Sequence, residues 1–160
     1  MELSAAQRER YERNLLVEGF TDRMQQALIA ARVAVVGAGG LGSAALNYLV
    51  AAGVGHLTLI ENDTVSLSNL QRQVLYTTAD MGRPKAEVAA MRLSRLNPGC
   101  DIRVVTDRLT AANAAGLLGG HDAVVDCTDN YDARYVIDDF CREAEVPMIY
   151  GTAEAVGGQV

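Results

Sequence analysis

The segment RVAVVGAGGLGSAALNYLVAAGVGHLTLIE, residues 32–61, decides the fold class of this chain. It begins with a short apolar run rich in valine, passes through a cluster of glycines and small residues, and ends in a second apolar run, HLTLI. Apolar runs of this length next to glycine predict strands that are buried on both faces. Two such strands around a helix predict a parallel pair joined by a right-handed crossover.

The same alternation of strand and helix continues toward the C-terminus. Apolar runs and turn residues predict three further strands and two further long helices, with one short helix between the third and fourth strands. The three strands are expected at 101–106, 121–127 and 146–150, and the long helices at 84–97 and 131–144. The fold class is therefore α/β, a doubly wound and mostly parallel Rossmann-like sheet with helices on both faces.

An N-terminal helical segment precedes the sheet. Ser4 begins a capping-box pattern for a first helix that we expect to end at Gly19, and Thr21 can cap a second helix. The chain thus divides into a helical arm, residues 1–31, and a Rossmann-like domain, residues 32–160. The long polar segment between the second strand and the next helix predicts a functional loop with one helical turn.

Composition excludes several classes of protein. The formal net charge of −6 argues against a general binder of nucleic acid or of anionic membranes. The polar start of the chain does not resemble a secretory signal, and no apolar run is long enough to span a membrane. Cys100, Cys127 and Cys141 form no C-x-x-C pair and are expected as buried thiols, so we expect a cytoplasmic protein.

The glycine cluster predicts a nucleotide site. Gly37, Gly39 and Gly42 have the G-x-G-x-x-G spacing and stand between a predicted strand and a predicted helix. Gly37 allows the tight turn, Gly39 and Gly40 let a ligand approach the backbone, and the helix N-terminus attracts an anion. Glu61, at the end of the second strand, can accept hydrogen bonds from ribose hydroxyls. These features suit NAD and ATP equally well.

Basic residues favour a triphosphate over a dinucleotide. Arg72 lies in the expected loop and Lys85 at the start of the next helix, and both are predicted to converge on the glycine turn. A triphosphate carries about four charges and calls for such clamps. Asp129 ends the fourth strand, where a carboxylate beside phosphates suits Mg²⁺. Asp126 can serve as an internal hydrogen-bonding carboxylate, and Asn130 can cap the following helix.

Several linear motifs carry a resemblance to a known family. In chain order these are RYERN, VVGAGGLGS, AAGVGHLTLIENDTVSLSNLQRQ, GRPKAE, LNPG, DCTDNYDARY and YGTAEAVGGQV. Together they cover almost the whole chain, and SNLQRQ followed by CTDN is highly specific. The chain resembles the ThiF/MoeB/HesA family of adenylyltransferases, which are bacterial relatives of the ubiquitin-activating enzymes.

The resemblance implies a reaction and a role for each matching residue. Such enzymes bind ATP and Mg²⁺ and adenylate the C-terminal carboxylate of a small ubiquitin-like sulfur-carrier protein, with release of pyrophosphate. The resemblance implies that Gly40 and Glu61 bind the nucleoside. It also implies that Lys85 contacts the outer phosphates and that Asp129 binds magnesium. Arg13 resembles an arginine that reaches the partner's site in a homodimer. The expected phosphate and cofactor contacts also include Asp63, Ser68, Asn69, Gln71, Arg72, Gln73 and Asn130.

Two departures from the family pattern leave alternatives open. Position 61 holds Glu where the family usually has Asp, which keeps the ribose contact with altered geometry. The chain also stops at GGQV, before the zinc-binding C-x-x-C pairs of the family, so we expect no zinc site and an unfinished final strand. A non-catalytic nucleotide-binding fragment therefore remains an alternative, and an NAD(P)-dependent oxidoreductase is a weaker one. Neither a membrane nor nucleic acid is expected as a partner.

Overall fold

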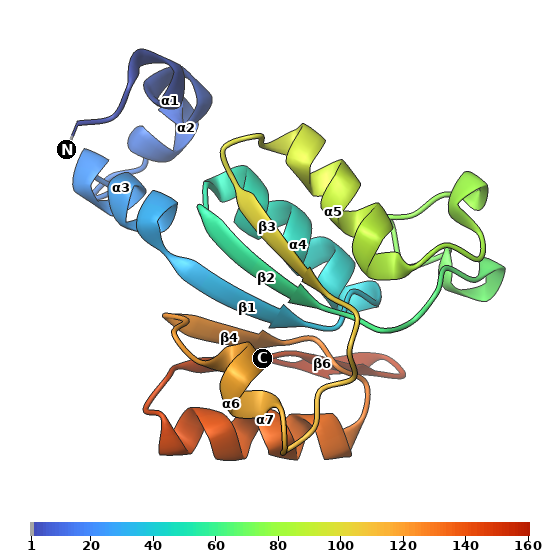
Figure 1. Ribbon diagram of the computed structural model, residues 1–160. Coiled ribbons are helices and arrows are strands. Elements are labelled where there is room, and N and C mark those ends of the chain that lie inside the picture. The colour runs from blue at the N-terminus through green and yellow to red at the C-terminus, as the bar shows by residue number, and fades with distance from the viewer. Residues whose placement is uncertain (1) are drawn as a thin grey trace.

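A five-stranded parallel sheet forms the centre of the computed structural model, which describes residues 2–160 (Figure 1). The strand order β3-β2-β1-β4-β5 puts the first strand beside the fourth, which confirms the doubly wound class. All pairings in this sheet are parallel, so the carboxyl ends of the strands share one edge. The strands are β1 Arg32–Val36, β2 His56–Ile60, β3 Asp101–Val105, β4 Ala123–Asp126 and β5 Met148–Tyr150.

Helices cover both faces of the sheet (Figure 1). Val35 of β1 packs in one core cluster with Leu46 of a helix, whereas its neighbour Val36 packs in a second cluster with Ile137 of another. Successive side chains of a strand point to opposite faces, so β1 is buried on both sides, as predicted. The helices are α4 Gly40–Ala52 and α5 Lys85–Leu96 on one face, and α6 Ala114–Leu118 and α7 Tyr131–Glu143 on the other. No helix among residues 2–160 combines the length and the apolar character needed to cross a membrane.

The N-terminal arm differs from its prediction. The capping box at Ser4 and the cap at Thr21 are both confirmed, but a single helix from Ser4 to Gly19 is wrong. The helix is interrupted at Tyr11, which leaves helical geometry with a φ of −104° and a ψ of 16°. The side chain of Tyr11 is buried, and its hydroxyl accepts a hydrogen bond from Nδ2 of Asn97 at 2.9 Å. The arm consists of α1 Ala5–Arg10, α2 Glu12–Leu15 and α3 Asp22–Ala30.

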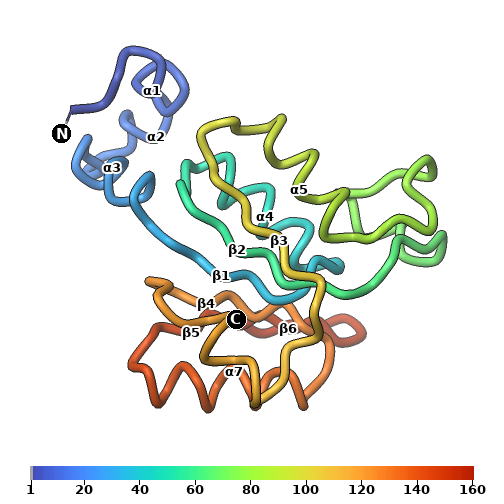
Figure 2. The backbone as a smooth tube through the Cα atoms, in the orientation of Figure 1, coloured from blue at the N-terminus to red at the C-terminus, as the bar shows by residue number. Residues whose placement is uncertain are grey.

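The segment between β2 and α5 leaves the sheet at its carboxyl edge and returns to the same side (Figure 2). It contains two short 3₁₀ turns, η1 Leu67–Asn69 and η2 Thr78–Asp80, where one helical turn was expected. Asp80 of η2 is buried and pairs with Arg92 of α5 at 2.5 Å. The ion pair ties the excursion to the helix, so the loop has a defined shape without long regular structure.

The last residues form a hairpin. β6 Thr152–Glu154 and β7 Gly157–Gln159 pair with each other in antiparallel fashion. These residues form two short strands where the start of one strand was expected, and Ala155, with a positive φ of 50°, lies in the turn between them. The hairpin brings Ala153 to the carboxyl edge of the main sheet, where it contributes to the wall of a cavity.

Candidate nucleotide site

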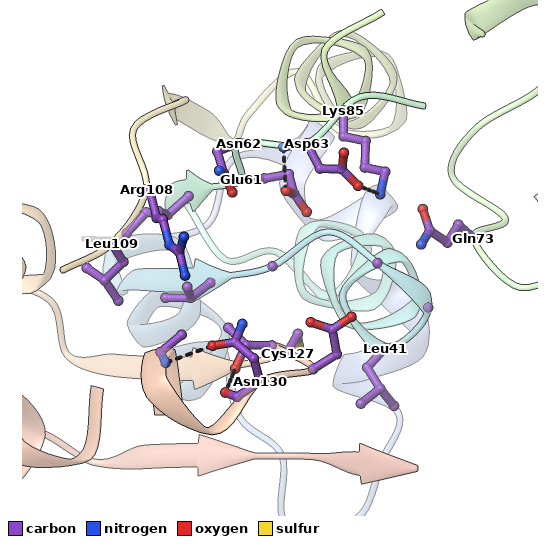
Figure 3. Close-up of a pocket in the computed structure, with 18 of the residues that line it drawn as sticks. Leu41, Glu61, Asn62, Asp63, Gln73, Lys85, Arg108, Leu109, Cys127 and Asn130 are labelled. Atoms are coloured by element: carbon purple, nitrogen blue, oxygen red, sulfur yellow. Dashed lines mark hydrogen bonds and ion pairs between the residues drawn. The ribbon is translucent and has the colours of Figure 1, made fainter. Parts of the chain in front are cut away.

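A cavity of about 670 Å³ opens at the carboxyl edge of the sheet, around the glycine turn (Figure 3). It lies between the ends of β1 and β4, from which α4 and α7 pass to opposite faces of the sheet. This is the topological switch point at which doubly wound sheets bind their ligands. The loop 61–84 and the segment after β3 complete the wall.

The glycine turn follows β1 and leads into α4. Gly37 has a φ of 93°, and a side chain there would come within 2.8 Å of the Cys127 carbonyl oxygen. A side chain at Gly42 would come within 2.0 Å of the Gly37 carbonyl oxygen, so α4 packs closely against the turn only because Gly42 has none. Gly39 caps α4 without a side-chain hydrogen bond, which leaves the helix N-terminus open to an anion.

Glu61 is part of the turn as well as of the cavity wall. Its Oε2 accepts a hydrogen bond from the Ala38 N–H at 2.8 Å, and its Oε1 accepts one from the Asp63 N–H at 2.9 Å. Each carboxylate oxygen can accept a second hydrogen bond. Glu61 therefore fastens β2 to the turn and still has acceptor capacity for a ligand, and its contact with ribose remains a prediction.

Two cationic side chains reach the cavity from the loop and from α5. Arg72 lies across Gly40, with its Cγ 3.4 Å from the position that a Cβ on Gly40 would occupy. Lys85 is 4% exposed and donates a hydrogen bond to Asp63 at 2.6 Å. The Lys85 ammonium lowers the pKa of Asp63 below its ordinary value. A buried lysine held in this way offers a fixed positive charge at the cavity wall.

A carboxylate also lines the cavity. Asp129, which follows β4, lines the cavity and makes no side-chain hydrogen bond or ion pair within residues 2–160. Asn130 beside it caps α7, accepting a hydrogen bond from the Ala133 N–H at 2.9 Å, which confirms the expected cap. Mg²⁺ in nucleotide sites commonly takes one or two protein carboxylates together with phosphate oxygens and water. Asp129 fits that donor set.

The structure brings most of the predicted site residues together and leaves some outside. Those that line the cavity are Gly37, Gly39, Gly40, Glu61, Asp63, Arg72, Gln73, Lys85, Asp129 and Asn130. Gly42, Ser68, Asn69 and Gln71 are absent from the wall: Gly42 lies behind the turn, and the other three belong to η1 and the residues after it. Arg13 is on α2, at the opposite end of the sheet (Figure 1), and cannot reach the cavity of its own chain.

Sequence reasoning missed a second part of the wall. Asn62 follows β2, and Asp107, Arg108 and Leu109 follow β3, all at the carboxyl edge. The guanidinium of Arg108 is directed toward the cavity (Figure 3) and makes no hydrogen bond or ion pair in the described part of the chain. These residues could have been predicted from their position directly after a predicted strand, because the carboxyl ends of parallel strands meet at this edge of the sheet.

The cysteines behave as structural thiols. Cys100 and Cys141 are buried and Cys127 is partly buried, and all three are free. Burial, together with the neighbouring Asp126, raises the pKa of the Cys127 thiol to about 11. Cys127 therefore stays protonated at neutral pH although it lies at the cavity, and it lacks the character of a nucleophile.

Known proteins are similar to this chain in sequence. The model of the ThiF family matches residues 11–160. Molybdopterin-synthase adenylyltransferase of Salmonella typhimurium is 48% identical over 159 residues, which are 99% of this chain and 64% of that protein. The SAMP-activating enzyme E1 of Haloferax volcanii is 41% identical over 99% of this chain and 59% of its own length. The chain thus spans less than two thirds of these relatives.

Solved structures show the same fold with nucleotide bound. The tRNA N6-threonylcarbamoyladenosine dehydratase TcdA of E. coli, in complex with ATP, superposes with a TM-score of 0.89 and 32% sequence identity. The superposition covers 100% of this chain and 65% of that one. A complex of the same dehydratase with AMP has the same TM-score and identity.

Proposed function

The chain belongs to the ThiF family, and we propose that it uses ATP and Mg²⁺ to adenylate the C-terminal carboxylate of a small ubiquitin-like sulfur-carrier protein. Several relatives bear names of this kind, such as the sulfur carrier protein ThiS adenylyltransferase of Escherichia coli, which is 42% identical over 94% of this chain. Adenylation joins the carboxylate to the α-phosphorus and releases pyrophosphate.

One arrangement supports this function most directly. The N-terminus of α4, which has no side-chain cap, lies at a single cavity at the switch point of the sheet, together with the cations Arg72, Lys85 and Arg108 and the carboxylate of Asp129. The cations Arg72 and Lys85 suit a chain of phosphates, whereas a dinucleotide needs fewer charges. The ATP complex of a structural neighbour supports the same ligand.

The chemistry needs positioning and charge and no general base. A carboxylate is already an anion at neutral pH, so it can attack phosphorus without losing a proton. In the proposed site Arg72 and the amides after Gly39 hold the phosphates, and Lys85 faces the departing pyrophosphate. Fixed positive groups of this kind lower the barrier by stabilising charge that develops in the transition state. Mg²⁺ held by Asp129 would neutralise further negative charge on the phosphates.

We propose a homodimer in which Arg13 reaches the partner's phosphates. Arg13 is exposed, belongs to an arm at the far end of the sheet, and has no ion-pair partner within residues 2–160. Its role therefore depends on a second copy. A cytoplasmic location fits the three free cysteines, because thiols persist in a reducing compartment.

Exchange of labelled pyrophosphate into ATP tests the proposed function. The chain is mixed with sulfur carriers that end in Gly-Gly, and exchange should depend on the carrier and on Mg²⁺. Arg72→Ala should lower the exchange rate by about 100-fold or more, because one charge-stabilising group is lost from the transition state. Arg83→Ala is the matched control, since Arg83 lies in the same excursion, outside the cavity wall.

The possible outcomes separate the competing functions. Carrier-dependent exchange that survives Arg72→Ala at the wild-type rate would contradict the assigned site. Binding of ATP without exchange, with every carrier tried, would support a nucleotide-binding fragment in place of an enzyme. Tighter binding of NADH than of ATP would support the oxidoreductase.

A further inference from the structure

Ala38, the second residue of the glycine turn, is held at both of its polar backbone groups. Its N–H donates to Glu61 at 2.8 Å. Its carbonyl oxygen accepts a hydrogen bond from the Tyr76 hydroxyl at 2.9 Å and another from the Ser43 hydroxyl at 3.3 Å. Ala38 and Ser43 are fully buried and Tyr76 is 4% exposed, so water does not compete for these bonds. Three side chains from three different segments therefore determine the orientation of one residue.

The orientation of the Ala38 carbonyl sets the direction of the next amide. No peptide bond among residues 2–160 is cis, and in a trans peptide the carbonyl and the following N–H point in opposite directions. Because the Ala38 carbonyl points to the buried Tyr76 hydroxyl, the Gly39 N–H points away from it. Gly39 lines the cavity, and its N–H has no acceptor within the described residues. That amide is available to an anion.

We propose that Tyr76 is a positioning residue of the nucleotide site, which directs the Gly39 N–H at the phosphates by holding the Ala38 carbonyl. This inference rests on the proposed function, since it assumes that the cavity binds ATP. Tyr76 does not line the cavity, so a list of residues that contact the nucleotide would not include it. The Tyr76 N–H also donates to the Gln73 carbonyl at 3.1 Å, so the tyrosine connects the turn to the loop that carries Arg72.

The environment of Tyr76 keeps its hydroxyl a hydrogen-bond donor. Burial, and to a lesser degree the negative charges of Glu61 and Asp63, raise the pKa of Tyr76 above its ordinary value. The phenol therefore keeps its proton throughout the range in which ATP-dependent enzymes work. Replacing Tyr76 by Phe removes only the hydroxyl and leaves the ring in its core cluster.

The test compares ATP binding by the wild type and by Tyr76→Phe. Calorimetry should show affinity for ATP weaker by about fivefold, the equivalent of one ordinary hydrogen bond of about 1 kcal/mol. In pyrophosphate exchange the KM for ATP should rise while kcat changes less, since ground-state positioning is lost. In ¹⁵N NMR spectra the shift of the Gly39 amide on ATP addition should be smaller than in the wild type.

Tyr11→Phe is the matched control. Tyr11 is also buried, and its hydroxyl is also hydrogen-bonded, to Asn97 at 2.9 Å, but far from the cavity. Tyr11→Phe should lower the free energy of unfolding, measured by urea denaturation, about as much as Tyr76→Phe does. It should leave the affinity for ATP unchanged. Equal losses of affinity in both variants would show a general structural effect and overturn the inference. If Tyr76→Phe does not fold, Ser43→Ala removes the weaker bond to the same carbonyl and should weaken ATP binding by a smaller factor.

The outcomes distinguish this inference from the proposed function. Wild-type affinity in Tyr76→Phe, with normal exchange activity, would overturn the role of Tyr76 and leave the adenylation site intact. A wild-type chain that binds no ATP would overturn both.

Discussion

The Nε of Arg134 donates a hydrogen bond to the fully buried carboxylate of Asp126 at 2.7 Å. The other oxygen of Asp126 accepts hydrogen bonds from the N–H and the hydroxyl of Thr128, and Arg134 donates to the Thr128 carbonyl at 3.2 Å. Both sides of Thr128 are therefore held, and Asp129 follows directly. The internal carboxylate predicted at Asp126 is confirmed, and its partner Arg134 is the part that the sequence did not reveal.

Loss of Arg134 should destabilise the fold strongly. Arg134→Ala leaves the Asp126 charge buried without a partner, and we expect a loss of about 3–5 kcal/mol in the free energy of unfolding. Urea denaturation followed by circular dichroism measures it. Arg142→Ala is the control, because it breaks a pair with Asp139 of similar length on the exposed face of the same helix. That change should cost less than about 1 kcal/mol, and equal effects would contradict the role of burial.

Asp129→Asn should abolish the dependence of nucleotide binding on magnesium. The amide keeps the shape of the side chain but lacks the charge that a hard cation prefers. Calorimetric titrations with ATP, with and without Mg²⁺, should differ for the wild type and coincide for the variant. Asp132→Asn, three residues further along on an exposed position outside the cavity wall, should behave like the wild type. A variant at position 129 that retains the full magnesium effect would exclude Asp129 as the ligand.

The Asp63–Lys85 pair should give the fold an acid-sensitive contribution. The pKa of Asp63 is lowered in the folded chain by Lys85, so the folded state holds this carboxylate in its charged form more tightly than the unfolded state does. The resulting stability is present above about pH 4 and is lost as the pH falls through the lowered pKa. Asp63→Asn should therefore reduce the urea midpoint at pH 7, by an amount that shrinks steadily below about pH 4.

A reciprocal variant checks the cause of that shift. Lys85→Met should return the pKa of Asp63 toward its ordinary value, which NMR titration of the carboxyl carbon can follow. A pKa that stays low without Lys85 would contradict the ion pair as its main cause.

Mixing two inactive variants tests the role of Arg13 across a dimer interface. Arg13→Ala and Arg72→Ala should each leave little exchange activity when alone. If Arg13 acts on the partner's site, one site in each mixed dimer combines an intact Arg13 with an intact Arg72. An equal mixture should then recover about a quarter of the wild-type activity, as random pairing of two-fold dimers predicts. No recovery, or a monomer by light scattering with full activity, would contradict the shared site.

Much of the candidate site could be predicted because its residues stand in local motifs. The turn at Gly37, the cap at Asn130 and the place of Asp129 just after a strand depend on neighbours within a few positions, so spacing alone identifies them. The interruption at Tyr11 and the position of Arg108 could not be predicted in this way. The buried hydroxyl of Tyr11 pairs with Asn97, 86 residues away, and Arg108 reaches the cavity because its strand ends beside three others.

The sequence by itself determined the α/β class, the order of the elements, the glycine turn and the family resemblance. Each depends on short-range patterns, namely the periods of helix and strand and the need for glycine where the backbone turns sharply. Tertiary structure alone decided which polar groups meet. Tyr76 contacts Ala38 across 38 residues and Lys85 contacts Asp63 across 22. Such contacts form only when packed segments bring distant residues within hydrogen-bonding distance. A local sequence pattern does not predict which distant residues will meet.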